Sequence, residues 1–233
     1  MKKITAALLV AGLFASMASA QAGTISATKS LPLASTPWEN ALSFSKFDTG
    51  LGKMTSIIFS LSGTLKGTAK AENTGTTAAD VTLGLGSLIT LKRPDDTALV
   101  IASPLFNHTY HLAAFDQNQD DDPDFLGASS VATGTQTVNV TNLFTDTSGA
   151  DFALFSSATP GLIHLNMKAV ANSSASGTGN LATIFKTKAS GSATVTYNYV
   201  DAGVVPEPAT FAIMGLGLGI LGLTRRRRSI KAA

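Results

Sequence analysis

The stretch Met54-Thr-Ser-Ile-Ile-Phe-Ser-Leu-Ser-Gly-Thr-Leu65 carries the strongest strand signal in this chain of 233 residues. Under a period of two, Ile57, Phe59, Leu61 and Gly63 share one face, and the opposite face is mostly serine. Alternation of this kind indicates a β-strand that buries one face and exposes the other. The stretch therefore predicts a sheet packed on a core through one side.

Weaker strand patterns extend in both directions from this stretch. They are bounded by Gly, Asn, Asp and Pro, and no long helical period interrupts them. The expected strands include Ile25–Leu33, Ala41–Phe47, Gly67–Glu72 as a second arm after Leu65, Val81–Leu91, Leu99–Ile101, Thr109–Phe115, Thr135–Thr141, Leu162–Ala171 and Ser192–Val200. In Val81–Leu91 the apolar positions change parity near Gly84-Leu85-Gly86, which predicts a β-bulge. The fold class expected is all-β: an antiparallel β-sandwich of jelly-roll type.

The first twenty residues have the three parts of a secretory signal peptide. Met1-Lys2-Lys3 is basic, Ile4 to Met17 is apolar, and Ala18-Ser19-Ala20 is an A-x-A cleavage site. The apolar run is too short for a transmembrane helix and ends in small residues. We expect cleavage after Ala20, with Ala18 and Ala20 as the residues read by the peptidase.

The other end of the chain also has three parts. Val205-Pro206-Glu207-Pro208 is followed by an uncharged run, Ala209 to Leu223, and then by Arg225-Arg226-Arg227-Arg228. The prolines keep the first part extended and accessible to a processing enzyme. As a helix, the apolar run would be about 22 Å long, and flanking arginines extend its reach toward a bilayer core of about 30 Å. A transmembrane helix is therefore expected, with the arginines holding its C-terminal end on the cytoplasmic side.

This order of parts resembles the PEP-CTERM sorting signal. The resemblance implies that a membrane enzyme, exosortase, recognises Pro206, Glu207 and Pro208. It further implies export in a Gram-negative bacterium, association with exopolysaccharide or biofilm matrix, and removal of the tail. The domain organisation expected is a signal peptide (1–20), a β-sandwich surface domain (21–204), the sorting signal (205–228) and a short tail (229–233).

The charge of the central part differs from that of the whole chain. Residues 21–205 contain ten Lys/Arg and fourteen Asp/Glu, a net charge of −4, against +2 for the full sequence. Nucleic-acid binding needs a basic face, so no nucleic-acid partner is expected. The sequence has no cysteine, which excludes a cysteine nucleophile and thiolate metal ligands.

One acidic segment is the candidate metal site. Asp116, Asn118 and Asp120 match the first three ligand positions of a calcium loop, but an EF-hand is rejected because Asp121 and Gly127 stand where Gly and Glu are needed. Two alternatives stay open, a solvated acidic loop and a looser calcium site. The latter would use Asp116, Asn118, Asp120, Asp122 and Asp124.

Other candidate constellations are weak. His108 and His111 would face opposite sides of a strand, so structural histidines are favoured over a metal site. Trp38, Tyr197 and Tyr199 are interpreted as core residues, with a sugar-stacking platform as the alternative. No nucleophile elbow or other catalytic signature is present, so no catalytic residue and no enzymatic activity are expected.

The central part is similar to the bacterial surface domains called choice-of-anchor E. The similarity implies an all-β domain on an interchangeable anchor. It rests on Phe47 with Leu51-Gly52, Gly67 to Asn73, Phe115-Asp116, Asp122-Pro-Asp-Phe-Leu-Gly-Ala-Ser129 and Val195-Thr-Tyr-Asn-Tyr199. The function expected is that of an exported, non-enzymatic structural or adhesion protein. Its partners would be exosortase, the secretion machinery and exopolysaccharide. The alternatives are a carbohydrate-binding module and, less favoured, a secreted hydrolase.

Overall fold

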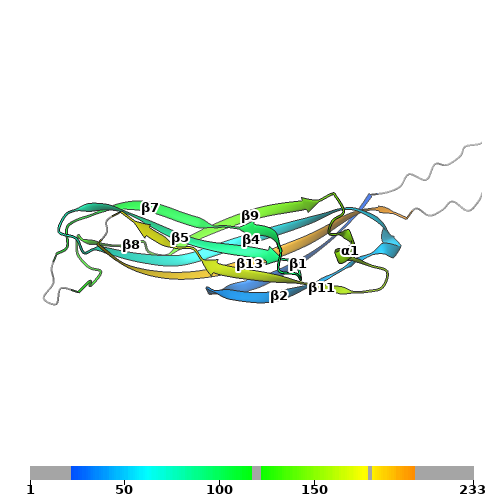
Figure 1. Cartoon of the computed structure of the whole chain (residues 1–233), viewed down its shortest axis with the longest axis horizontal. Helices are drawn as coiled ribbons and strands as arrows, with labels where there is room; N and C mark the ends of the chain where they lie inside the picture. Colours follow the sequence, from blue (N-terminus) through cyan, green and yellow to red (C-terminus); the bar gives the residue numbers. More distant parts are fainter. Residues whose placement is uncertain (1–21, 117–121, 178–179, 203–233) are drawn as a thin grey trace, which may run out of the picture.

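The computed structural model describes residues 22–116, 122–177 and 180–202, and most of them lie in strands (Figure 1). The strands are β1 (Ala22–Ser35), β2 (Trp38–Ser45), β3 (Phe47–Asp48), β4 (Gly52–Asn73), β5 (Ala79–Lys92), β6 (Ala98–Ala102), β7 (Leu105–Leu112), β8 (Ser130–Ala132), β9 (Gln136–Asp146), β10 (Ser156–Ser157), β11 (Leu162–Ala171), β12 (Ser174–Ser176) and β13 (Leu181–Asp201). The helical parts of this region are a 3₁₀ turn, Thr49–Leu51, and the short helix α1, Phe152–Phe155.

Two sheets form the body of the molecule. In the first, β13 lies between β1 and β4, and the other edge of β4 pairs with β9 and β8. In the second, β5 is central: β11 and β12 pair with one edge, β6 and β7 pair with the other, and β2 lies outside β11. All of these ladders are antiparallel, whereas β3 and β10 form a parallel pair of two residues.

The strands pair as in a long hairpin that has been rolled up. β1 pairs with β13, β2 with β11, β4 with β9, and β5 with β6 and β7, so each strand of the first half meets its counterpart from the second half. A two-sheet jelly roll is built in this way. The prediction of an all-β antiparallel fold is confirmed.

The core lies between the two sheets and is supplied by alternate residues of each strand. Ile57, Phe59 and Leu61 of β4 point inward, as the alternation predicted, and have no solvent exposure. They pack with apolar residues of β5, β11 and β13, among them Leu91 and Leu165. A second cluster, built around Leu65, Leu83 and Leu112, continues the core along the length of the sandwich. Burial of each such side chain contributes about 1.5 to 3 kcal/mol to stability.

β4 is a single strand rather than two arms. It runs without interruption from Gly52 to Asn73, because β13 pairs with it over its whole length. At about 3.3 Å per residue, its 22 residues span about 70 Å. The sandwich is correspondingly elongated (Figure 1).

The predicted bulge in β5 is wrong. Val81, Leu83, Leu85, Ile89 and Leu91 are all buried and keep one parity through the two glycines. The irregularity lies in the neighbours instead, since β5 changes partners from β7 to β6 and from β12 to β11 near Gly86. A side chain at Gly86 would collide with the Asn172 carbonyl. This glycine therefore allows the segment between β11 and β12 to approach β5 closely.

The first and last described residues lie at the same end of the sandwich. Ala22, where β1 begins, lies opposite Val200 near the end of β13 (Figure 1). The predicted signal peptide and the predicted helix at Ala209–Leu223 lie outside the described residues. Within the described part of the chain, no helix has the length and apolar character needed to cross a membrane.

Candidate functional site

The end of β13 is where the folded part of the chain leads into the sorting signal predicted from sequence. Asp201 is paired with Gly52 of β4, and the Ala202 amide donates to the Leu51 carbonyl at 3.2 Å. The predicted processing residues begin at Val205, three positions after Ala202, and all of them lie outside the described residues: Val205, Pro206, Glu207, Pro208 and Arg225 to Arg228. Ala18 and Ala20, the predicted cleavage residues, also lie outside.

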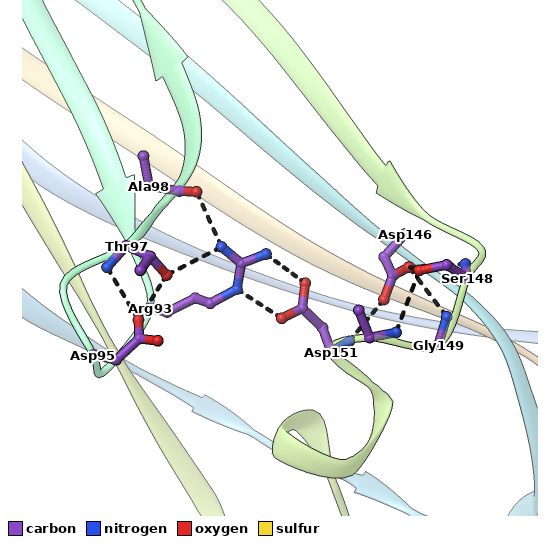
Figure 2. A network of polar contacts seen from close by, with 9 residues as sticks. Arg93, Asp95, Thr97, Ala98, Asp146, Ser148, Gly149 and Asp151 are labelled. Atoms are coloured by element: carbon purple, nitrogen blue, oxygen red, sulfur yellow. Dashed lines mark hydrogen bonds and ion pairs between the residues drawn. The ribbon is translucent and has the colours of Figure 1, made fainter.

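A polar network joins the ends of β5 and β9, at the end of the sandwich that carries Asp201 (Figure 2). Arg93, just after β5, donates from Nε and Nη2 to the two carboxylate oxygens of Asp151, both at 2.7 Å. Its Nη1 reaches the Ala98 carbonyl at 3.0 Å. This two-pronged pair is the geometry in which guanidinium and carboxylate interact most strongly. It ties the turn between β5 and β6 to the segment before α1.

Asp146, at the end of β9, orders the loop that carries Asp151. Its carboxylate accepts hydrogen bonds from the amides of Asp151 (2.8 Å), Ser148 (2.9 Å) and Gly149 (3.2 Å), and from the Ser148 hydroxyl (Figure 2). The Asp151 amide makes the largest contribution to lowering the pKa of Asp146; burial opposes it, and Ser148 and Gly149 lower the pKa further. All of these bonds favour the charged form.

Asp146→Asn is expected to destabilise the protein by about 1.5 to 3 kcal/mol at pH 7, the range for hydrogen bonds to a charged group. Because the folded-state pKa is below the unfolded value of about 3.9, this stabilisation is present above pH 4 and is lost as the pH falls through the folded pKa. The difference in urea midpoint between wild type and variant should therefore shrink between pH 5 and pH 2.5. A difference that is constant over this range would contradict the assignment.

The acidic segment is partly described. Asp116, Asp122 and Asp124 are in the structure, whereas Asn118 and Asp120 lie outside the described residues. Among the residues that are described, no three His, Cys, Asp or Glu side chains come close enough to hold a metal ion. The Oδ1 atom of Asp124 accepts a hydrogen bond from the Leu126 amide at 2.8 Å, which is a local turn interaction. The calcium site therefore stays a prediction.

Glu72 binds the residues that come directly after the acidic segment, from Phe125 to Ser129. It lies near the end of β4 and has no solvent exposure. Its Oε2 accepts from the Phe125 amide at 2.6 Å, and its Oε1 accepts from the Ser129 hydroxyl at 3.3 Å. Phe125 has a φ of 57°, in the left-handed region. The buried carboxylate thus fixes this end of the acidic segment onto the sheet.

Glu72→Ala is expected to release this segment without unfolding the sandwich. The Phe125 amide would lose its acceptor, and its hydrogen exchange should become faster by about tenfold or more, since a lost hydrogen bond of about 1.4 kcal/mol corresponds to a factor of ten. Glu72→Gln keeps one acceptor oxygen and should have a smaller effect. Unchanged exchange at Phe125 in the alanine variant would show that the carboxylate does not hold the segment.

The three aromatic candidates differ in their burial. Tyr197 is 2% exposed and donates from its hydroxyl to the Ser45 carbonyl at 2.9 Å, so it is a core residue as the sequence favoured. Burial raises its pKa. The Trp38 ring nitrogen donates to the Ala189 carbonyl, and the Tyr199 ring packs on Phe47. Trp38 and Tyr199 are half-buried. Because Tyr197 is buried, the three do not form a sugar-stacking platform.

The histidines take part in local contacts. His108 packs against the Tyr110 ring with a centroid distance of 4.6 Å, His111 is 2.7 Å from the Asp80 carboxylate, and His164 is 2.9 Å from the Ser43 hydroxyl. In β7, His108 and His111 are three residues apart and so fall on opposite faces.

The outer face of the first sheet has two features that the sequence patterns did not reveal. Hydroxyl and amide side chains of β1, β13, β4 and β9 bond to one another across the strands, as in Ser26–Thr196 (2.9 Å) and Thr141–Ser62 (3.0 Å). On the same face lies a hollow of about 250 Å³, here called the lysine hollow. It is lined by Leu33, Lys66, Gly67, Thr68, Thr135, Lys186 and Lys188.

Comparison with known proteins identifies the end of the chain. Residues 204–228 match the PEP-CTERM protein-sorting motif. The match includes all eight predicted processing residues, from Val205 to Arg228, and begins just after β13. The motif implies an exported protein that exosortase, a membrane enzyme, sorts. The similarity to choice-of-anchor E domains is not confirmed by these comparisons.

Two viral structures that resemble the chain do so only remotely. No curated protein matches it. A structure of infectious bursal disease virus Gx strain is 13% identical, with a TM-score of 0.21, over 88% of this chain and 50% of the viral one. A subviral particle of the VP2 protein from the same virus is 12% identical, with a TM-score of 0.21, over 77% of this chain and 37% of that chain. The chain thus spans half or less of the length of these viral proteins, and similarity this low supports no argument about function.

Proposed function

We propose that this is a non-enzymatic structural or adhesion protein, displayed first on the membrane and then in the envelope or extracellular matrix of a Gram-negative bacterium. The observation that carries the proposal is the sorting motif placed directly after the last strand of the sandwich. Secretion would remove the signal peptide after Ala20. The run Ala209–Leu223 would then hold the protein in the membrane until exosortase acts at Pro206-Glu207-Pro208.

The shape of the sandwich supports a role in display. Because β13 leads into the motif, the end that carries Asp201 is the one next to the membrane. Glu72 and Phe125 lie at the other end, about 70 Å away as judged from the length of β4. A long, rigid body of this kind would hold its far end clear of the surface.

The use of the buried carboxylates supports the non-enzymatic part of the proposal. Asp146, Asp151 and Glu72 each accept hydrogen bonds from neighbouring backbone or side-chain groups, so they serve to fix loops. A hydrolase would need two carboxyl groups facing a shared cleft. The described pockets are instead lined by lysine, threonine and apolar side chains, or by apolar side chains with Asn142.

A carbohydrate-binding role is the second candidate, and one observation favours it. The lysine hollow and the bonded hydroxyls further along the same strands lie on one face of the first sheet. Exopolysaccharide in the matrix would be the partner for that face.

Intact-mass analysis of the protein in its host, with and without the sorting enzyme, tests the proposal. We expect a form that begins at Gln21 and ends near Val205 only when the enzyme is present. Glu207→Gln should reduce this processing, whereas Asp201→Asn, a matched change in β13, should not. If the tail is still attached in both strains, the sorting proposal is wrong and the protein is an ordinary membrane-tethered one.

A further inference from the structure

The lysine hollow is a concentration of positive charge on an otherwise acidic body. Lys66 of β4 and Lys188 of β13 are directly opposite each other in the ladder, and Lys186 is opposite Thr68. Directly opposed side chains have Cβ atoms about 4.5 to 5.5 Å apart, and like charges at that distance repel. All three lysines are exposed. None of them takes part in the salt bridges found between described residues.

The hollow runs across the strands rather than along them. Its lining comes from β1 (Leu33), β13 (Lys186, Lys188), β4 (Lys66, Thr68) and the residue before β9 (Thr135). Four neighbouring strands at about 4.8 Å spacing give it a length of about 14 Å. It therefore suits a segment of an extended chain better than a single small ion.

The surrounding surface offers hydrogen bonds in regular rows. Next to the lysines along β13 and β4, Ser190 is opposite Thr64 and Ser192 is opposite Ser62. Ser192 also accepts from Ser30 at 2.9 Å. A hydroxyl has one donor and two acceptor positions, so each bonded pair keeps one O–H and several lone pairs for a ligand. Rows of this kind fit a ligand with many hydroxyl groups.

We propose that the lysine hollow binds an acidic polysaccharide through its carboxylates. Lys66, Lys186 and Lys188 donate charge-assisted hydrogen bonds to successive uronate groups, the threonines and serines bond to sugar hydroxyls, and Leu33 contacts the apolar side of a sugar ring. Such a ligand removes the repulsion between Lys66 and Lys188. The proposal rests on the proposed matrix role, because it names the substance to which the displayed protein would attach.

Other polyanions fit the surroundings less well. Nucleic acid needs a broad basic face, but residues 21–205 carry a net charge of −4. A membrane surface would meet the end of the sandwich near Asp201. The hollow lies away from that end, since Lys186 and Lys188 are near the start of β13.

The test uses the full chain in detergent, with polygalacturonate as the probe and its fully methyl-esterified form as the uncharged match. We expect binding of the charged polymer only, weakening steeply as salt is raised from 0.05 to 0.5 M. The double variant Lys66→Gln/Lys188→Gln should bind at least about tenfold more weakly. Its urea midpoint should be unchanged or higher, because a repulsive pair has been removed.

The control is Lys92→Gln/Lys168→Gln, which removes two lysines of the second sheet that already have carboxylate partners. It has the same net charge as the test variant and should bind like wild type. Equal loss in both variants, equal binding of the methyl ester, or equal or tighter binding of polyphosphate, DNA or phosphatidylglycerol vesicles would each overturn the proposal. The intact-mass assay does not involve these lysines, so failure of binding and failure of sorting can be told apart.

Discussion

Phe59→Ala is expected to lower the free energy of unfolding by about 3 to 5 kcal/mol, the range for removing a buried aromatic ring from a core. Phe59 has no solvent exposure. Its ring meets the Phe155 ring edge-on at a centroid distance of 4.9 Å and stacks with Phe144 at 6.0 Å. The side chain thus joins β4 to α1 and β9, and the variant would leave a cavity between them.

Urea denaturation measures the loss, and Phe144→Ala provides a matched control. Phe144 belongs to the same aromatic group but is 38% exposed, so less apolar surface returns to water when it is truncated. Its cost should be well below that of Phe59→Ala. Equal costs for the two variants would mean that Phe59 is not at the centre of the core.

Arg93→Met is expected to cost about 3 to 5 kcal/mol, because it removes one partner of a largely buried ion pair. The Asp151 side chain is 7% exposed, and the variant would leave its charge without the guanidinium. Arg93→Lys keeps the charge but loses the two-pronged geometry, so an intermediate cost is expected. The loop between β9 and α1 should show the first loss of hydrogen-exchange protection.

Lys92→Met is the matched control for Arg93. The Lys92 ammonium is 3.6 Å from the carboxylate of Asp96, a side chain that is 69% exposed. Exposed pairs of this kind contribute about 0 to 1 kcal/mol. In Arg93→Met/Asp151→Leu both charges are gone, and part of the stability should return. The assignment is wrong if Arg93→Met costs no more than Lys92→Met.

The sequence predicted those parts of the fold in which one strand carries its own pattern. In β11, Ile163, Leu165 and Met167 are buried where the alternation placed them. The first half of β13 was missed, because around Ile184 and Lys186 few side chains alternate in character. It is a strand because it pairs with β4. The bulge in β5 was predicted wrongly, since its two glycines reflect the approach of a neighbouring chain.

The candidate sites also differ in whether their residues lie in one segment of the sequence or are brought together by the fold. The sorting motif could be read from sequence because all its parts lie within one short segment. The lysine hollow could not, because Lys66 and Lys188 are far apart in sequence and become neighbours only through the register of β4 and β13. One local signal was present: Lys186 and Lys188 are two residues apart, which puts both on one face of a strand. Arg93 and Asp151 gave no such signal.

The position of β13 also determines how the protein would respond to mechanical tension. A pull between a membrane anchor beyond Asp201 of β13 and a polymer held at Lys66 of β4 would draw these two antiparallel strands past each other along their axes. β13 is paired with β1 on one side and with β4 over its full length on the other. Antiparallel hydrogen bonds are perpendicular to the strands, so such a force shears many of them together instead of unzipping them one at a time. The sandwich would therefore resist stretching without any disulfide, as its cysteine-free sequence requires.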